Sequence, residues 1–162
     1  MTTMTKRQFV GTTMGAFAGL TMASTARAQG VTHVVEMLNK APDSKERQVF
    51  HPAVAKIAVG DTITFVATDK GHNSQSNKDV MPEGAAEWKG KIGKDIDVTF
   101  DVPGVYAYHC TPHRAVGMVG LVLVGDVTKE EIEAVMDAKH RGKAKKRYEE
   151  YVAAAIEMLD AA

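Results

Sequence analysis

The feature that most constrains the fold is a series of short apolar and alternating segments between Val31 and Val127. Within Ile96–Val102, apolar side chains occupy every second position, and aspartate or threonine lies between them. A period of two is typical of a strand with one buried face. Many short strands of this kind, separated by turn residues, predict a mainly β protein with a sandwich or barrel architecture.

Further strands are expected on both sides of this segment. Residues 32–38 are expected to be the first strand, and a turn at Gly60–Asp61 precedes a strand with three apolar side chains on one face, Ile63, Phe65 and Ala67. Residues 82–88 are expected to be a loop with one helical turn. Residues 119–126 are almost continuously apolar, which indicates a central strand that is covered on both faces.

A turn at Pro103–Gly104 leads into a strand whose side chains alternate between two faces. Tyr106, Tyr108 and Cys110 share one of these faces. His109 is adjacent to the thiol of Cys110 but belongs to the opposite face, which we expect to be exposed to solvent. His109 is therefore a poor candidate to act together with that thiol.

The pattern changes to helical spacing after Gly125. Thr128 and Glu131 have the spacing of a capping box. Apolar residues follow at helical spacing, namely Ile132, Val135 and Met136. A break is expected at Gly142, and a second helix then carries one apolar stripe, namely Tyr148, Tyr151, Val152, Ala155, Ile156 and Leu159. Two amphipathic helices of this kind are expected to close one side of the sandwich.

The N-terminus has the pattern of a secretory signal peptide. Lys6 and Arg7 precede a short apolar run, and an A-x-A cleavage site follows at Ala26–Ala28. The run is rich in glycine and threonine and too short to span a bilayer. We therefore expect a cleaved signal peptide at 1–28, a sandwich domain at 29–127 and a pair of helices packed on it at 128–162.

Removal of this signal peptide would leave an acidic protein. The 20 basic residues include Lys6, Arg7 and Arg27, whereas all 20 acidic residues follow Ala28, so 17 basic and 20 acidic groups give a net charge of −3. This balance does not indicate a nucleic-acid-binding protein. Because no long apolar run remains, no insertion into a membrane is expected.

Cys110 is the only cysteine of the chain. In an exported protein it cannot form an intramolecular disulfide, and a free thiol is prone to oxidation unless it is buried or bound.

Cys110, His113 and Met118 have the spacing C-x2-H-x4-M within one loop between two strands. Thiolate, thioether and imidazole favour copper, and two histidines, one cysteine and a weak axial methionine define the blue-copper electron-transfer site.

One more histidine is needed for such a site, and His72 is the best candidate. It lies between Gly71 and Asn73 in a loop after a predicted strand, and functional residues concentrate in loops. Adjacent loops at one end of a sandwich can bring His72 to Cys110 in spite of their separation in the sequence. The remaining histidines have no soft ligands beside them and are interpreted as surface or packing residues, namely His33, His51 and His140.

The segments "GHNSQS" and "YHCTPHRAVGMVGLVLVGD", followed by two helices, resemble the pseudoazurins, a group of small periplasmic cupredoxins. The resemblance covers almost all of the chain after the signal peptide. It implies a Greek-key β-sandwich of about eight strands with two C-terminal α-helices. It also implies that His72, Cys110, His113 and Met118 bind one type 1 copper ion, and that the backbone N–H of Asn73 donates to the sulfur of Cys110.

The resemblance further implies a periplasmic one-electron carrier and not an enzyme. Proteins of this family pass single electrons to reductases of denitrification, above all copper nitrite reductase, and a cytochrome-type protein is the expected donor. We expect a monomer that binds neither nucleic acid nor membrane. His109, Arg114 and Val116 depart from the side chains that are common in relatives, and these departures bear on the partner surface.

The expected exit for electrons is His113, whose outer ring nitrogen would face solvent within an apolar patch made by Pro112, Ala115 and Val116. Such a patch suits a small, transient interface. Pro112 and Gly117 are expected to make the loop rigid. Five lysines lie in segments that could surround the patch and steer an acidic partner, or could simply solvate loops, namely Lys40, Lys70, Lys78, Lys89 and Lys91.

The main alternative function is copper delivery or storage in the periplasm, because such proteins use the same types of ligand. Carriers of that kind usually need exposed, exchangeable ligands in methionine-rich runs, whereas the methionines here are dispersed. A Cys–His hydrolase would need an accessible thiol and an oxyanion hole. A structural zinc site would need more cysteines, and a catalytic copper enzyme would need more histidines for a second metal.

Overall fold

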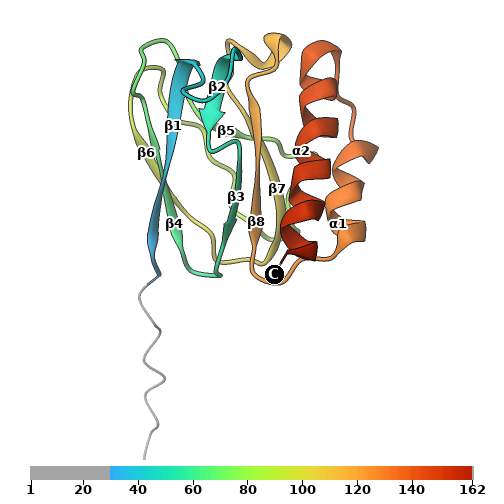
Figure 1. The fold of residues 1–162 in the computed structure, drawn as a ribbon. Helices are drawn as coiled ribbons and strands as arrows, with labels where there is room; N and C mark the ends of the chain where they lie inside the picture. Colours follow the sequence, from blue (N-terminus) through green and yellow to red (C-terminus); the bar gives the residue numbers. More distant parts are fainter. Residues whose placement is uncertain (1–29, 162) are drawn as a thin grey trace, which may run out of the picture.

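The computed structural model describes residues 30–161, and the predicted signal peptide lies outside the described residues. In this part of the chain, eight strands form two four-stranded sheets, and two α-helices follow them (Figure 1). The strands are β1 (Thr32–Lys40), β2 (Arg47–His51), β3 (Val54–Ile57), β4 (Thr62–Val66), β5 (Gln75–Ser76), β6 (Ile96–Thr99), β7 (Gly104–His109) and β8 (Val119–Val124). The expected sandwich with two C-terminal helices is confirmed.

The two sheets have mixed strand directions. The first has the order β2-β1-β4-β6, in which β1 and β4 are parallel and the other neighbours antiparallel. The second has the order β3-β8-β7-β5, in which only the β3–β8 pair is parallel within the described residues. Because β7 and β8 are antiparallel neighbours, the end of β7 and the start of β8 lie together at one end of the sandwich.

The space between the sheets is filled by an aromatic core. Phe65 packs edge-to-face against Tyr108, with ring centroids 5.1 Å apart, and stacks on Trp88 at 6.1 Å. Edge-to-face and offset stacked pairs are the favoured arrangements of aromatic rings. Cys110 and Met118 have no exposed surface and belong to the same core. The face that Tyr106, Tyr108 and Cys110 were predicted to share is therefore the inner face of this sheet.

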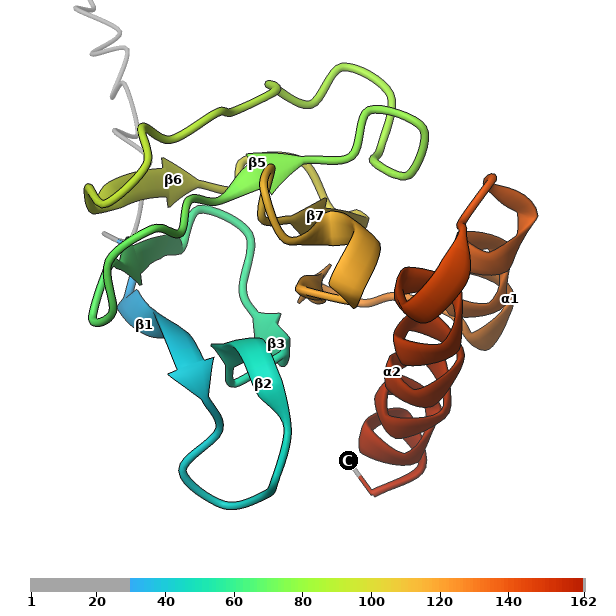
Figure 2. The same ribbon diagram turned by 90° about the horizontal axis from the view of Figure 1, so that it is seen from above.

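The helices cover the outer face of the second sheet, on the side away from β1 (Figure 2). They are α1 (Lys129–Glu133), the 3-10 helix η2 (Ala134–Asp137) and α2 (Gly142–Asp160). β8 is buried along its whole length, as the apolar run predicts. Its outward side chains meet the apolar stripe of α2, in which Tyr148 and Ala155 are fully buried.

The capping box is confirmed, but the first helix is shorter than expected. Thr128 Oγ1 accepts from the N–H of Glu131 at 3.2 Å, and the Glu131 carboxylate accepts from the N–H of Thr128 at 2.7 Å. The chain leaves helical geometry after η2, where His140 Nε2 donates to the carbonyl of Val135 at 2.7 Å. Gly142 is the first residue of α2 and not the end of the preceding helix.

Residues 82–88 contain a turn closed by the Ala85 N–H and the Pro82 carbonyl at 3.2 Å, without a helix. Within residues 30–161, no helix is long and apolar enough to cross a membrane.

Candidate metal centre

One loop supplies three of the four predicted ligands. It comprises residues 110–118, here called the metal loop, and it joins β7 to β8 through the 3-10 helix η1 (Arg114–Val116). The Cys110 N–H donates to the carbonyl of Met118 at 2.9 Å, and the Met118 N–H donates to the carbonyl of His113 at 3.0 Å. These bonds close the loop on itself at the upper end of the sandwich in Figure 1.

The fourth predicted ligand, His72, enters from the segment between β4 and β5 and is fully buried. Its Nε2 lies 3.1 Å from Oδ1 of Asn39, which is in β1. Because an amide oxygen only accepts, Nε2 carries the proton and Nδ1 keeps a free lone pair. Asn39 thus fixes the tautomer in which His72 presents Nδ1 to the centre.

The side chains of His72, Cys110 and His113 converge on one point. Nδ1 of His113 lies 3.1 Å from Nδ1 of His72 and 3.4 Å from the Cys110 sulfur. The Cys110 sulfur lies 3.9 Å from Nδ1 of His72. Among the described residues this is the one group of His, Cys, Asp and Glu side chains arranged to hold a metal ion. Met118 is buried in the core beside Cys110 and bonded through its backbone to the same loop.

Burial governs the protonation of two of these groups. It raises the pKa of the Cys110 thiol, while hydrogen bonds from the backbone N–H groups of Asn73 and His113 oppose this shift. Burial also lowers the pKa of His72, the charge of His113 lowers it further, and Asp69 acts in the opposite direction. His72 is therefore held neutral, as a metal ligand must be, and metal binding would displace the proton of Cys110.

The side chain of Asn73 joins the two segments that build the centre. Its Oδ1 accepts from the N–H of Thr111 at 2.8 Å, and its Nδ2 donates to Thr111 Oγ1 at 2.9 Å and to the carbonyl of Gly90 at 3.0 Å. The Asn73 N–H lowers the pKa of Cys110, in the direction expected for the predicted hydrogen bond to sulfur. The structural roles of Asn39 and of the Asn73 side chain were not predicted, because an asparagine that fixes a neighbouring segment carries no distinctive sequence signal.

The donor set fits copper. Two imidazole nitrogens and a thiol meet in a buried space, a thioether lies in the adjoining core, and no carboxylate belongs to the group. Soft sulfur ligands with imidazole favour copper over calcium or magnesium, which prefer oxygen ligands.

The prediction that His109 faces solvent is wrong. His109 is 7% exposed, and burial, followed by the positive charges of Arg114 and Lys89, lowers its pKa to about 4. The alternation itself holds, because His109 lies on the face of β7 that carries Val105 and Ala107. That face packs against the helices and Val80 instead of water.

The surface above the centre is apolar and has basic surroundings. Pro112, Ala115 and Val116 are exposed around the partly buried His113, and the five predicted lysines are exposed.

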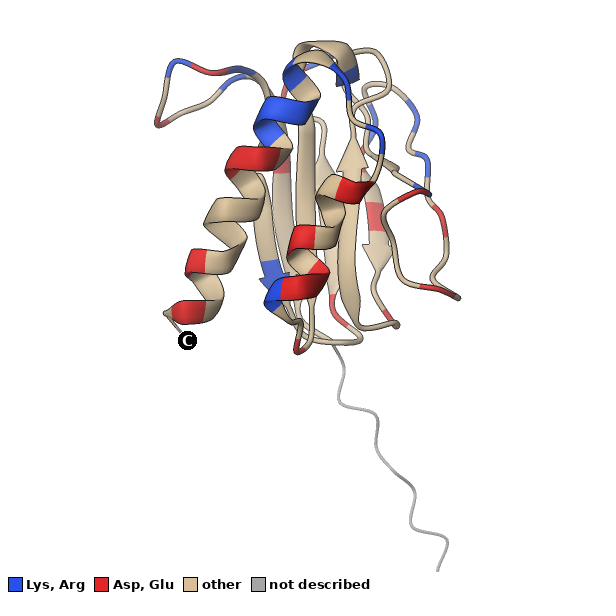
Figure 3. Cartoon of the chain, turned by 90° about the vertical axis from the view of Figure 1, so that its right-hand side faces the viewer, with Lys and Arg blue, Asp and Glu red and all other residues tan. Residues whose placement is uncertain are grey.

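Two hollows flank η1, with volumes of about 760 and 530 Å³. Basic groups line them, and among these only Arg114 was singled out from the sequence; the others are Lys45, Arg47, Lys139, Arg141, Lys143, Lys146 and Arg147. Figure 3 shows that the first turns of α2 are basic, whereas its C-terminal end is acidic.

The chain is similar in sequence and in structure to known copper-binding proteins. Residues 35–125 match the profile of a family described as copper binding proteins, plastocyanin/azurin family. A pseudoazurin of Paracoccus pantotrophus is 42% identical over 134 residues, which cover 83% of this chain and 90% of that protein. A putative pseudoazurin of Rhizobium leguminosarum bv. viciae is 42% identical over 126 residues, which cover 78% and 81% of the two chains. The crystal structure of pseudoazurin from Methylobacterium extorquens AM1 superposes with a TM-score of 0.70 at 39% identity, covering 76% of this chain and 98% of that one.

Proposed function

The chain belongs to the pseudoazurins, within the plastocyanin/azurin family of copper-binding proteins, and from this premise we propose that it carries single electrons in the periplasm. Copper is its cofactor. The observation that supports the proposal is the buried convergence of two imidazole nitrogens and one sulfur at the end of the sandwich. We assign His72, Cys110, His113 and Met118 as the ligands of one type 1 copper ion, and we assign no catalytic residue.

The protein residues hold the ligands in a fixed arrangement. Copper, when bound, supplies the redox change by passing between Cu(II) and Cu(I). Asn39 orients the ring of His72, and the N–H groups of Asn73 and His113 donate to the Cys110 sulfur and so stabilise its thiolate. Hydrogen bonds within the metal loop keep the remaining ligands near that sulfur. A site fixed in this way needs little rearrangement when its charge changes.

The proposed route for electrons runs through His113. Its Nδ1 faces the cluster, while the ring is partly exposed beside three apolar residues, Pro112, Ala115 and Val116. Val116 is 45% exposed. A small apolar contact brings a partner close to His113 and still allows fast separation.

Export and domain division are part of the same proposal. The sequence pattern supports a signal peptide at 1–28, and we assign the copper-binding sandwich to 29–127 and the helical pair to 128–162. An exported protein meets an oxidising compartment, and metal binding would protect its single cysteine from oxidation there. The full burial of His72, Cys110 and Met118 argues against copper delivery, which needs exchangeable ligands.

Copper binding by the purified protein tests the assignment directly. We expect one copper ion per chain and an intense blue or green colour, which reductant bleaches reversibly. His72→Gln and Cys110→Ser should lose the colour, whereas His51→Gln, a histidine outside the cluster, should keep it. A copper-loaded wild-type protein without colour would contradict the proposal.

The proposed partners are copper nitrite reductase as acceptor and a cytochrome-type protein as donor. Exposed lysines around the apolar patch would raise the rate of encounter with an acidic partner, and salt would reduce this effect. Lys70→Ala and Lys89→Ala should therefore weaken the dependence of the association rate on ionic strength. Lys56 pairs with Leu123 near the far end of β8, so Lys56→Ala is the matched control. If the association rates of all three variants depended equally on salt, Lys70 and Lys89 would not steer the partner.

A further inference from the structure

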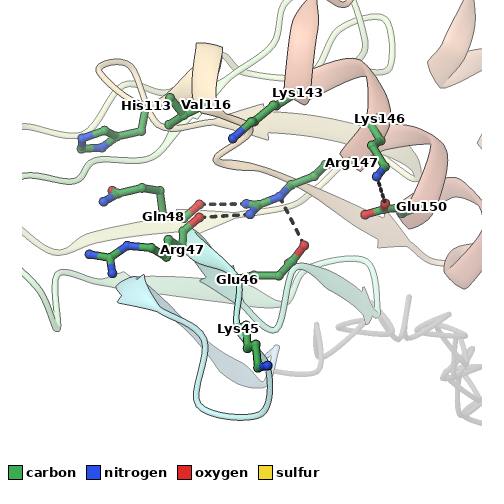
Figure 4. A pocket seen from close by; sticks show the side chains of 10 residues that line it. All are labelled: Lys45, Glu46, Arg47, Gln48, His113, Val116, Lys143, Lys146, Arg147 and Glu150. Carbon is green, nitrogen blue, oxygen red and sulfur yellow. Dashed lines mark hydrogen bonds and ion pairs between the residues drawn. The ribbon is translucent and has the colours of Figure 1, made fainter.

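Arg147 of α2 is bonded to both the metal loop and β2. Its Nη1 donates to the carbonyls of Gly117 and Gln48, each at 2.9 Å, and its Nη2 donates to the carbonyl of Arg47 at 3.0 Å. Its Nε lies 3.6 Å from the carboxylate of Glu46. Figure 4 shows the side chain of Arg147 reaching from the helix toward β2. The side chain is only 12% exposed, so water competes weakly for these contacts.

The contact with the metal loop is close and involves a residue next to a proposed ligand. Gly117 directly precedes Met118 and has a φ of 95°, in the region that favours glycine. A Cβ at Gly117 would lie 3.2 Å from Cδ and 3.3 Å from Nε of Arg147, tighter than ordinary contact. The backbone just before Met118 therefore rests directly against the side chain of Arg147.

The contact with β2 depends on an unusual backbone conformation. Successive carbonyls of a regular strand point to opposite sides, yet those of Arg47 and Gln48 both accept from one guanidinium. Gln48 has a φ of 55°, which is unfavourable for a residue other than glycine and persists where the surroundings fix it. The planar guanidinium of Arg147 donates to both carbonyls at once, and the ammonium group of a lysine cannot reproduce all of these hydrogen bonds.

We propose that Arg147 is a positioning residue of the copper site, which holds Met118 in place by tying the carbonyl of Gly117 to β2. The inference rests on the assignment of Met118 as a ligand. In blue-copper sites the methionine is a weak ligand, so the protein and not the metal would fix the position of Met118. The axial ligand also tunes the reduction potential, so a small displacement of Met118 is measurable.

Three variants test this role. Arg147→Met removes the donors and keeps most of the apolar stem, and Arg147→Lys keeps the charge without the fork. Lys146→Met is the matched control, because Lys146 lines the same hollow, is 78% exposed and pairs with Glu150. Within residues 30–161, no hydrogen bond joins Lys146 to the metal loop.

The expected result is specific to Arg147. In Arg147→Met, the ratio of the visible absorption bands and the reduction potential should both change. Amide hydrogen exchange of Met118 in the reduced protein should become roughly tenfold faster, as expected when charge-assisted hydrogen bonds are lost. Arg147→Lys should give smaller changes in the same direction, and Lys146→Met should match the wild type.

Several outcomes would overturn the inference. One is a wild-type spectrum, potential and Met118 exchange rate in Arg147→Met or, if that variant does not fold, in Arg147→Lys. Another is an equal change in Lys146→Met, since the effect would then come from charge and not from position. A wild-type protein that binds copper without colour would instead refute the proposed function, so the two failures are distinguishable.

Discussion

The sheet that contains β7 and β8 separates two cores of different composition. The inner core, between the sheets, is rich in aromatic rings and contains Cys110 and Met118. The outer core, beneath the helices, is aliphatic, and Tyr148 is the one aromatic residue among its buried members in the described part of the chain. Both cores take side chains from the same two strands. The difference indicates that the inner core builds the metal site, whereas the outer core holds the helices that support it.

Ring packing explains why the inner core suits a rigid site. Tyr108 packs edge-to-face on Phe50 with centroids 4.7 Å apart, and on Phe65 at 5.1 Å. Large rings have few rotamers and prefer specific relative orientations. The backbone that leads into Cys110 is therefore held by contacts that cannot slide easily.

The largest expected effect comes from a ring of the inner core. Phe65 is fully buried and contacts three other rings, so Phe65→Ala should lower the free energy of unfolding by about 3–5 kcal/mol. It should also change the visible spectrum of the copper protein, because Phe65 supports Tyr108. Urea unfolding and absorption spectra of the same samples measure both effects. An unchanged spectrum would show that packing in the inner core does not influence the geometry of the metal site.

A matched truncation in the outer core should affect stability alone. Leu123 is fully buried, faces the helices and lies toward the end of β8 that is remote from the metal loop. Leu123→Ala should lower the free energy of unfolding by about 2–5 kcal/mol. The copper spectrum should stay as in the wild type. If Leu123→Ala altered the spectrum as much as Phe65→Ala, the comparison between the cores would fail.

Tyr148 connects the two cores and should have an intermediate effect. Its hydroxyl donates to the carbonyl of Tyr108 at 2.9 Å, and Tyr108 is two residues before Cys110. Tyr148→Phe should lower the free energy of unfolding by about 1–2 kcal/mol, because a buried carbonyl loses a partner. The spectral change should be smaller than in Phe65→Ala. Unfolding at the wild-type urea concentration would show that this bond contributes nothing.

The smallest expected effect is at the capping box, at the start of α1. Thr128→Ala removes the side chain that accepts from the N–H of Glu131 and should cost ~1 kcal/mol. The reduction potential should not change, since no hydrogen bond joins α1 to the metal loop in the described residues, unlike Arg147 of α2. Glu130→Ala, an exposed change in the same turn, should cost less. A shift in potential for Thr128→Ala would mean that α1 also acts on the site, and not only α2 through Arg147.

The sequence predicted the parts of the fold that have a simple periodicity. Alternation assigned Tyr106, Tyr108 and Cys110 to one face, and the capping box located the start of α1. β2 was not predicted, since Val49 and Phe50 are adjacent and both buried, and Gln48 has a left-handed backbone. β5 has only two residues, too few for any period.

The meeting of His72, Cys110 and His113 was predicted from the sequence, but the residues that support them were not. The spacing of Cys110, His113 and Met118 within one loop is typical of chemistry that needs soft ligands close together, and this spacing is visible in the sequence. Asn39 and Arg147 lie far along the chain from the groups they hold, and only the pairing of strands and the packing of α2 bring them near. His109 was misplaced because alternation gives the face of a side chain but not what covers that face.

A redox titration of the purified, copper-loaded protein, followed by its visible absorption, shows whether the copper at this site carries single electrons reversibly. We expect a single one-electron transition with one copper per chain, identical in the reductive and oxidative directions. A protein that holds copper but shows no such transition, or whose colour does not return on reoxidation, would contradict the assignment of this site as an electron carrier.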